Sequence, residues 1–251
     1  TPDFASYMAF ARVLGRSLAE MHAVLAQPTD DAAFAPETMD KDAVEALRAG
    51  VARQVEDALA VLERGGDWTE QDNLGALAER LVQRRDDLLA LVSRLSGAAT
   101  GQVRTRIHGD LHLGQVLVTG GGVTFIDFEG EPAKPLEARR AKASPLRDVA
   151  GMLRSFDYAA ALGAVAAAGV AQGVQDRAVD VVSQFEVMAS ETFLEGYQAV
   201  AGEQPRALLD LFLLEKAAYE VSYEAANRPG WLGTPLRGLA ATIDRLLEDA
   251  P

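Results

Sequence analysis

Two short segments near the middle of the chain carry the residues best suited to chemistry. The first, residues 108–115, reads His-Gly-Asp-Leu-His-Leu-Gly-Gln, and the second, residues 125–132, reads Phe-Ile-Asp-Phe-Glu-Gly-Glu-Pro. They offer the carboxylates of Asp110 and Asp127 and the amide oxygen of Gln115. A carboxylate can receive the proton of an attacking hydroxyl, and carboxylate and amide oxygens can hold Mg²⁺ on phosphates. These residue types indicate phosphoryl transfer to a hydroxyl group.

A predicted β-hairpin joins the two segments. The apolar runs at residues 116–118 and 123–126 are separated by glycines 120–122, a pattern typical of two strands and a turn. Because a short hairpin returns the chain, we expect Gln115 and Asp127 to lie close together, as two ligands of one cation must. Taken singly, each residue reads as an ordinary turn or surface side chain. The order, spacing and hairpin context together favour the catalytic interpretation.

Three more polar residues accompany these segments. His108 is grouped with Asp110 as a catalytic candidate, although its position favours support of the loop by hydrogen bonds over acid chemistry. His112 has no metal partner at a suitable spacing and is interpreted as structural. Asp148 falls in the first turn of a predicted helix, where the helix dipole favours a carboxylate.

A predicted helix over residues 206–226 and the turn after it carry the candidates for binding an acceptor molecule. These candidates are Tyr219, Glu220, Tyr223, Glu224, Asn227 and Trp231. The two tyrosines and the two glutamates are each four residues apart, so each pair shares one helix face. Carboxylates, amides and aromatic faces are the groups that hold sugars. The alternative, core tyrosines with glutamates paired to Arg228 or Arg237, stays open.

The elements expected around these segments are mainly helical. Apolar residues recur at three- and four-residue spacing through residues 4–25, 44–62 and 74–95, which predicts three helices. After the hairpin, Ser144 and Pro145 form a helix start, and further helices are predicted over residues 177–200, 206–226 and 237–249. We therefore predict a mainly α fold with a small β-hairpin, divided into 1–100 (helical), 101–135 (catalytic and metal loops) and 136–251 (helical, with the acceptor site).

Composition limits the classes of partner. The formal net charge is −13 at pH 7, which argues against nucleic acid or an anionic membrane as a partner. An acidic protein can bind ATP only if a metal ion and local cations neutralise the phosphates, so Mg²⁺ follows from the hypothesis. The absence of cysteine fits the cytoplasm, and no apolar stretch approaches the ~20 residues of a membrane span.

The two segments resemble the catalytic and metal loops of protein-kinase-like small-molecule kinases, which include the aminoglycoside phosphotransferases. Residues 104–240 are most similar to the maltokinase family, through the two segments, Ser-Pro-Leu-Arg-Asp-Val-Ala at 144–150 and Tyr-Glu-Val-Ser-Tyr-Glu at 219–224. Protein kinases usually have Asn where Gln115 stands, whereas maltokinase-like families have Gln. This difference supports the narrower resemblance.

The resemblance implies specific roles. Asp110 would be the catalytic base, Gln115 and Asp127 would bind Mg²⁺, Glu129 would lie near the metal and the phosphates, and Asp148 would tether the backbone of the catalytic loop. The implied reaction is ATP-dependent phosphorylation of a sugar, with maltose converted to maltose 1-phosphate. The alternatives are a kinase for glucosamine or another aminosugar, an aminoglycoside kinase, or a non-catalytic kinase-like module partnered with a trehalose-metabolising enzyme.

The same resemblance carries expectations about the rest of the enzyme. Kinases of this type have a β-sheet lobe with a lysine and a phosphate-covering loop before the catalytic loop. The first hundred residues are instead predicted to be helical, so we expect this chain to be a C-terminal lobe that is nearly inactive alone. A fusion to, or association with, trehalose synthase is also implied.

Overall fold

A computed structural model describes residues 4–66, 68, 73–120, 122–132, 134–167 and 172–248. The chain forms two compact units, and each unit combines two separate stretches of sequence. The first unit contains Thr1–Glu37 and Val103–Gln204, and the second contains Thr38–Gln102 and Pro205–Pro251. The predicted divisions, with boundaries at residues 100 and 135, are each one continuous stretch of sequence, whereas each of these units combines two stretches.

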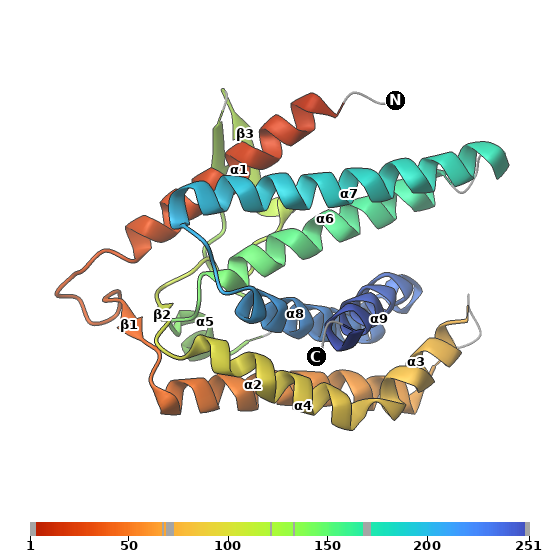
Figure 1. The fold of residues 1–251 in the computed structure, drawn as a ribbon, viewed down its shortest axis with the longest axis horizontal. Coiled ribbons are helices and arrows are strands. Elements are labelled where there is room, and N and C mark those ends of the chain that lie inside the picture. The colour runs from red at the N-terminus through yellow and green to blue at the C-terminus, as the bar shows by residue number, and fades with distance from the viewer. Residues whose placement is uncertain are drawn as a thin grey trace. The chain divides into compact units, whose positions relative to one another are not determined.

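The first unit contains three long helices and one hairpin. The helices are α1 (Ala5–Leu25), α6 (Leu146–Ala167) and α7 (Gln172–Ala201), with α7 alongside α1 and α6 (Figure 1). The hairpin strands are β3 (Val116–Thr119) and β4 (Gly122–Phe125), antiparallel with Val116 opposite Phe125. Gly120 has a positive φ at the turn, and Gly121 lies outside the described residues. The short helix α5 (Leu136–Arg140) follows the second catalytic segment.

Helices α1 and α7 pack so closely that their backbones touch. A Cβ atom added to Gly15 would lie 2.0 Å from the Phe193 carbonyl oxygen, and one added to Gly196 would lie 2.2 Å from the Arg12 carbonyl oxygen. Real Cβ atoms do not approach other atoms this closely, so glycine is required at both positions. Leu14 lies beside this crossing and is fully buried.

Gly15→Ala is therefore expected to lower the free energy of unfolding by about 1–3 kcal/mol, because the new methyl group forces the two helices apart. Urea denaturation monitored by circular dichroism measures the loss. Gly50→Ala in α2 is the control, since nothing lies within 4 Å of its added Cβ. That change should raise stability by up to about 1 kcal/mol through helix propensity. Equal stability of Gly15→Ala and wild type would contradict the close approach.

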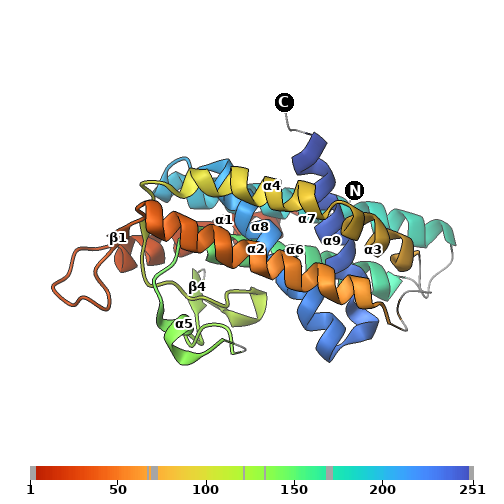
Figure 2. The same cartoon turned by 90° about the horizontal axis from the view of Figure 1, so that it is seen from below.

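Helices make up most of the described part of the second unit. Its helices are α2 (Lys41–Arg64), α3 (Leu74–Gln83), α4 (Arg85–Ser96), α8 (Arg206–Asn227) and α9 (Gly233–Glu248). Helices α2 and α4 lie side by side (Figure 2), and α8 packs against α2, α4 and α9. The two-residue strands β1 (Glu37–Thr38) and β2 (Val103–Arg104) lie at two of the three chain positions where one unit gives way to the other.

The predicted fold class, mainly α with a small β-hairpin, is confirmed, but one predicted helix is wrong. Residues 74–95 form two helices instead of one, broken at Arg84, whose ψ of 17° is not helical. The apolar spacing continues across this break, so periodicity could not reveal it. Asp86 and Asp87 in the first turn of α4 are an N-terminal signal that could have done so. No helix in the described part of the chain is both long and apolar enough to cross a membrane.

Candidate active site

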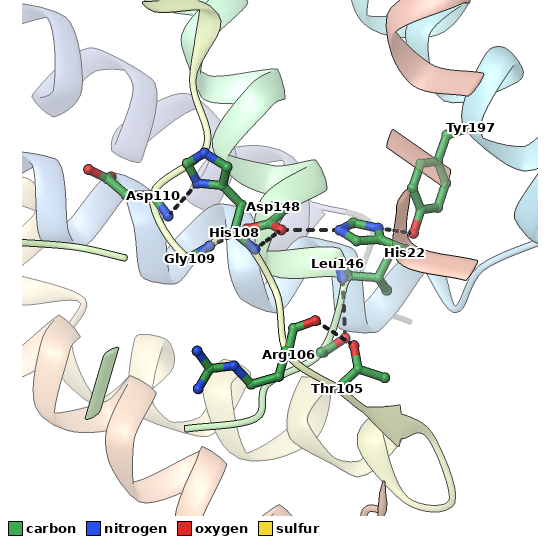
Figure 3. A network of polar contacts seen from close by, with 10 residues as sticks. His22, Thr105, Arg106, His108, Gly109, Asp110, Leu146, Asp148 and Tyr197 are labelled. Atoms are coloured by element: carbon green, nitrogen blue, oxygen red, sulfur yellow. Dashed lines mark hydrogen bonds and ion pairs between the residues drawn. The ribbon is translucent and has the colours of Figure 1, made fainter. Parts of the chain in front are cut away.

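The loop that carries Asp110 is held by a buried carboxylate on the next long helix. Asp148, in the first turn of α6, is 1% exposed. Its Oδ2 accepts a hydrogen bond from the backbone N–H of His108 at 2.8 Å, and its Oδ1 accepts one from Gly109 at 2.9 Å (Figure 3). Hydrogen bonds to an ionised acceptor are about twice as strong as neutral ones. Both carboxylate oxygens therefore fix the backbone just before Asp110.

His108 links the two catalytic segments through its ring. Its Nδ1 accepts a hydrogen bond from the Asp110 backbone N–H at 3.3 Å, and its Nε2 donates to the Ile126 carbonyl at 2.8 Å. The ring is 1% exposed and lies 4.8 Å from the Phe128 ring, centroid to centroid. Both ring nitrogens bond to backbone groups, which is the loop support that the position of His108 indicates in the sequence. A catalytic role for His108 beside Asp110 stays a prediction.

The two loops cross at a pair of glycines. Gly109 has a φ of +86°, and a Cβ added there would lie 3.3 Å from the Gly130 Cα atom. Gly130 has a φ of +72°, and its added Cβ would lie 3.2 Å from the Arg139 Cβ atom. Both positions need the left-handed backbone that glycine adopts without strain. The crossing brings the segment of Asp110 against the segment of Asp127.

Gln115 and Asp127, the predicted metal ligands, lie in contact. The Gln115 Nε2 donates to Asp127 Oδ2 at 3.0 Å, and the Ile126 backbone N–H donates to the Gln115 carbonyl at 3.1 Å. This second bond continues the β3–β4 pairing by one residue on each strand. Asp127 has a φ of +66°, which is uncommon for a non-glycine residue and is typical of strained functional positions.

The pair has the donor set that Mg²⁺ prefers. Within the described residues, no group of three or more His, Cys, Asp or Glu side chains is arranged to hold a metal. Mg²⁺ commonly binds one or two protein oxygens and takes its other ligands from phosphates and water. A half-turn of the Gln115 amide would put its oxygen where Nε2 now lies, 3.0 Å from Asp127 Oδ2. The residue types of this pair therefore fit a magnesium ion that also binds phosphates.

Glu129 and His112 have local partners. The Glu129 carboxylate lies 3.6 Å from Arg139 and is more than half exposed, so its predicted place near the metal stays a prediction. His112 precedes the 3-10 helix η3 (Leu113–Gln115), and its Nδ1 accepts from the Gly114 backbone N–H at 3.0 Å. His112 is an N-cap, in line with its structural interpretation.

Two buried residues that sequence reasoning missed continue this network away from Asp110. His22 on α1 lies with its Nε2 3.1 Å from Asp148 Oδ2, and its Nδ1 lies 2.9 Å from the Tyr197 hydroxyl on α7 (Figure 3). Burial, with the negative charge of Asp148 as the smaller cause, raises the pKa of Tyr197. The available signal was a histidine on the apolar face of α1, where a buried polar group needs partners.

The six predicted acceptor-binding residues lie in the second unit, on α8 and the 3-10 helix η4 (Pro229–Trp231). The ring centroids of Tyr219 and Tyr223 are 5.9 Å apart. Neither ring is part of the core, since Tyr223 and Trp231 are exposed and Tyr219 is half-buried. Asn227 donates from Nδ2 to the Tyr223 carbonyl at 2.8 Å. A cationic side chain lies over each tyrosine ring: Lys216 Nζ is 4.9 Å from the centroid of Tyr219, and Arg228 Cζ is 5.6 Å from the centroid of Tyr223.

Glu220 and Glu224, the two glutamates of the predicted acceptor site, are both buried, and Glu224 forms an ion pair with Arg228. Glu224, 2% exposed, accepts from Arg228 Nε at 2.9 Å and from Arg228 Nη2 at 2.5 Å. This is the pairing that the alternative interpretation named, although the tyrosines of that interpretation are not in the core. Asp110 belongs to the other unit, so a shared site of these residues with Asp110 stays a prediction.

A pocket of about 470 Å³ also lies in the second unit. Its polar lining consists of Arg94, Arg206, Asp210 and Arg245. Asp210 is buried and accepts from Arg206 Nε at 3.1 Å and from Arg245 Nη2 at 2.9 Å. None of the six predicted acceptor-binding residues lines this pocket.

A helical fold whose His-Gly-Asp loop and Asp-Phe-Glu-Gly loop meet beside a hairpin defines a kinase-like phosphotransferase. Residues 3–131, about half of the chain, match the phosphotransferase enzyme family (APH). The chain belongs to this family.

Among its relatives are two glucosamine kinases. The one from Mycolicibacterium smegmatis is 32% identical over 175 residues, which are 66% of this chain and 41% of the relative. The one from Streptacidiphilus jiangxiensis is 28% identical over 249 residues, which are 95% of this chain and 50% of the relative. The chain thus spans half or less of the length of these relatives.

Solved structures show the same fold. A glucosamine kinase in complex with glucosamine, ADP and inorganic phosphate matches with a TM-score of 0.77 at 23% identity, over 96% of this chain and 53% of that one. A second crystal form of glucosamine kinase gives a TM-score of 0.78 over 97% of this chain and 55% of that one, also at 23% identity. The kinase-like fold of this chain is therefore shared along nearly its whole length.

Proposed function

We propose that the protein containing this chain transfers a phosphoryl group from ATP to a hydroxyl group of an aminosugar, with glucosamine as the acceptor. The observation that carries the proposal is the Asp148 carboxylate, which accepts from the His108 and Gly109 N–H groups and so holds the loop of Asp110. Membership of the phosphotransferase family and the two glucosamine kinase relatives support both the reaction and the acceptor.

The proposed roles follow from the contacts around each group. Asp110 takes the proton from the acceptor hydroxyl and holds that oxygen in line with the phosphoryl group. Gln115 and Asp127 would hold Mg²⁺, which would neutralise charge on the phosphates. His108 and the crossing of Gly109 with Gly130 keep the two loops in register, so the base and the metal ligands face the same reactants.

Glucosamine takes the place of maltose as the proposed acceptor. The sequence resembles maltokinases in its motifs, but the two relatives described above are glucosamine kinases. An aminosugar carries an ammonium group, which needs a carboxylate partner in a binding site. Glu220 and Glu224 are the carboxylates of the proposed acceptor site, with Tyr219, Tyr223 and Trp231 as its aromatic faces. The association with trehalose synthase and the cytoplasmic location stay predictions.

An acceptor panel tests this proposal on the complete protein. ADP release with MgATP is measured against glucosamine, N-acetylglucosamine, glucose, maltose and an aminoglycoside. We expect kcat/KM to be roughly 10–100-fold higher for glucosamine than for glucose, because a hydrogen bond to a charged group contributes about 1.5–3 kcal/mol. N-Acetylglucosamine is the matched neutral analogue and should be poor. Added salt should reduce the difference in kcat/KM between glucosamine and its neutral analogues, because it screens the charge of the ammonium group.

Each other outcome identifies a different acceptor. Equal use of glucosamine and glucose would show that no carboxylate binds the ammonium group. Preference for maltose would favour the maltokinase interpretation, and preference for the aminoglycoside would favour an aminoglycoside kinase. ADP release that does not depend on any of these acceptors would contradict the proposed function.

A further inference from the structure

We propose that His22 and Tyr197 are positioning residues for the catalytic loop, acting through Asp148. Three helices far apart in the sequence contribute to this buried chain of hydrogen bonds: Tyr197 from α7, His22 from α1, and Asp148 from α6. The hydrogen-bond chain ends on the backbone of His108 and Gly109, next to Asp110 (Figure 3). Its effect on turnover rests on the proposed function, whereas its effect on the loop backbone does not.

The tautomer of His22 follows from its two partners. Asp148 Oδ2 lies 3.1 Å from the His22 Nε2, and an ionised carboxylate accepts only, so Nε2 carries the proton and donates. The Nδ1 of the neutral ring is then an acceptor and takes the Tyr197 O–H at 2.9 Å. Because burial raises the pKa of Tyr197, its hydroxyl keeps the proton that it donates. Each donor in the chain thus meets one acceptor.

The contact with His22 restrains the rotation of the Asp148 carboxylate. Oδ2 accepts both from His22 Nε2 and from the His108 backbone, while Oδ1 accepts from the Gly109 backbone. The three donors together fix one orientation of the carboxylate. A rotation of the carboxylate that breaks its contact with His22 therefore also misaligns its two backbone hydrogen bonds. The His22 side chain, which contacts this carboxylate, is only 4% exposed. Water therefore does not readily take the place of His22 as a donor to Asp148.

Tyr197 acts at the far end by fixing the imidazole. Without the Tyr197 hydroxyl, the buried Nδ1 loses its donor, and the imidazole is held only by its contact with Asp148. The ring is then freer to rotate away from the carboxylate, so loss of the hydroxyl should loosen Asp148 without touching it. The tight crossing of α1 and α7 at Gly15 and Gly196 holds the two donors of the chain in place. The catalytic loop is in this way tied to the α1–α7 pair.

The test compares three variants of the complete protein: His22→Leu, His22→Gln and Tyr197→Phe. The first readout is hydrogen exchange of the His108 and Gly109 amides by NMR, because these are the groups that Asp148 holds. We expect His22→Leu to lower protection of these two amides by roughly 10-fold or more, with a smaller loss in Tyr197→Phe. His22→Gln should recover most of it, because its amide can donate where Nε2 donates.

The second readout is the split between kcat and KM with glucosamine and ATP. A displaced loop affects the position of Asp110 and not ground-state binding, so kcat should fall on the order of 10-fold in His22→Leu with KM unchanged. Phe193→Leu is the control for a merely structural loss, since Phe193 is fully buried one turn before Tyr197. It should lower stability while leaving the exchange of the two amides and kcat near wild type.

The outcomes separate this inference from the proposed function. If His22→Leu behaves like Phe193→Leu in both readouts, the positioning role is overturned. If His22→Leu does not fold, the comparison of Tyr197→Phe with His22→Gln decides by the same amides. If the wild-type protein phosphorylates no sugar, the proposed function fails, and the amide exchange still supports or contradicts the positioning role.

Discussion

Asp110→Asn in the complete protein is expected to lower kcat for glucosamine by about 10²–10⁴-fold, which is the range that a positioned general base contributes. The amide keeps the shape of the side chain but cannot receive the hydroxyl proton. The KM for ATP should stay near the wild-type value, because the change leaves the contact of Gln115 with Asp127, the proposed metal ligands, in place. Steady-state kinetics with coupled ADP detection measures both constants.

The control for this variant is Asp30→Asn, which makes the same chemical change at an exposed position of the first unit. It should leave kcat and KM unchanged. Turnover of Asp110→Asn within a few-fold of wild type would remove Asp110 from the mechanism. A large rise in the KM for ATP at constant kcat would instead place Asp110 in nucleotide binding.

Asp148→Ala is expected to lower the free energy of unfolding by about 3–5 kcal/mol and to abolish turnover. The change removes the acceptor of three groups: the buried N–H of His108, the partly buried N–H of Gly109 and the buried ring of His22. Breaking a buried charged interaction by removing one partner costs this much because the other groups stay buried without partners. Denaturant unfolding gives the stability, and the ADP assay gives the turnover.

Asp148→Asn keeps the volume and one acceptor oxygen, so it should lose less stability than Asp148→Ala while still impairing turnover. Its amide NH₂ would face a backbone N–H, which is the wrong polarity for the tether. Asp180→Ala, at an exposed position of α7, is the control and should change stability by less than about 0.5 kcal/mol. A stability of Asp148→Ala equal to that of Asp180→Ala would contradict the tether.

The hairpin and the contact of its two flanking residues could be predicted because they depend on neighbouring residues. Alternating apolar runs around a glycine turn determine the strands, and the pairing of Val116 with Phe125 carries Gln115 back toward Asp127. The helical character of the rest followed from apolar spacing in the same way. The break at Arg84 did not, because a one-residue interruption leaves that spacing intact.

By itself, the sequence determined the class of chemistry, since the order and spacing of Asp110, Gln115 and Asp127 lie within one short stretch that folds locally. The tertiary structure alone decided what supports that chemistry. The bond from His22 to Asp148 spans 126 residues, and the bond from His22 to Tyr197 spans 175. Such contacts depend on how α1, α6 and α7 pack, and periodicity along a chain carries no information on which distant polar residues meet. The hydrogen bond from His108 to Ile126 likewise depends on how the two loops pack together.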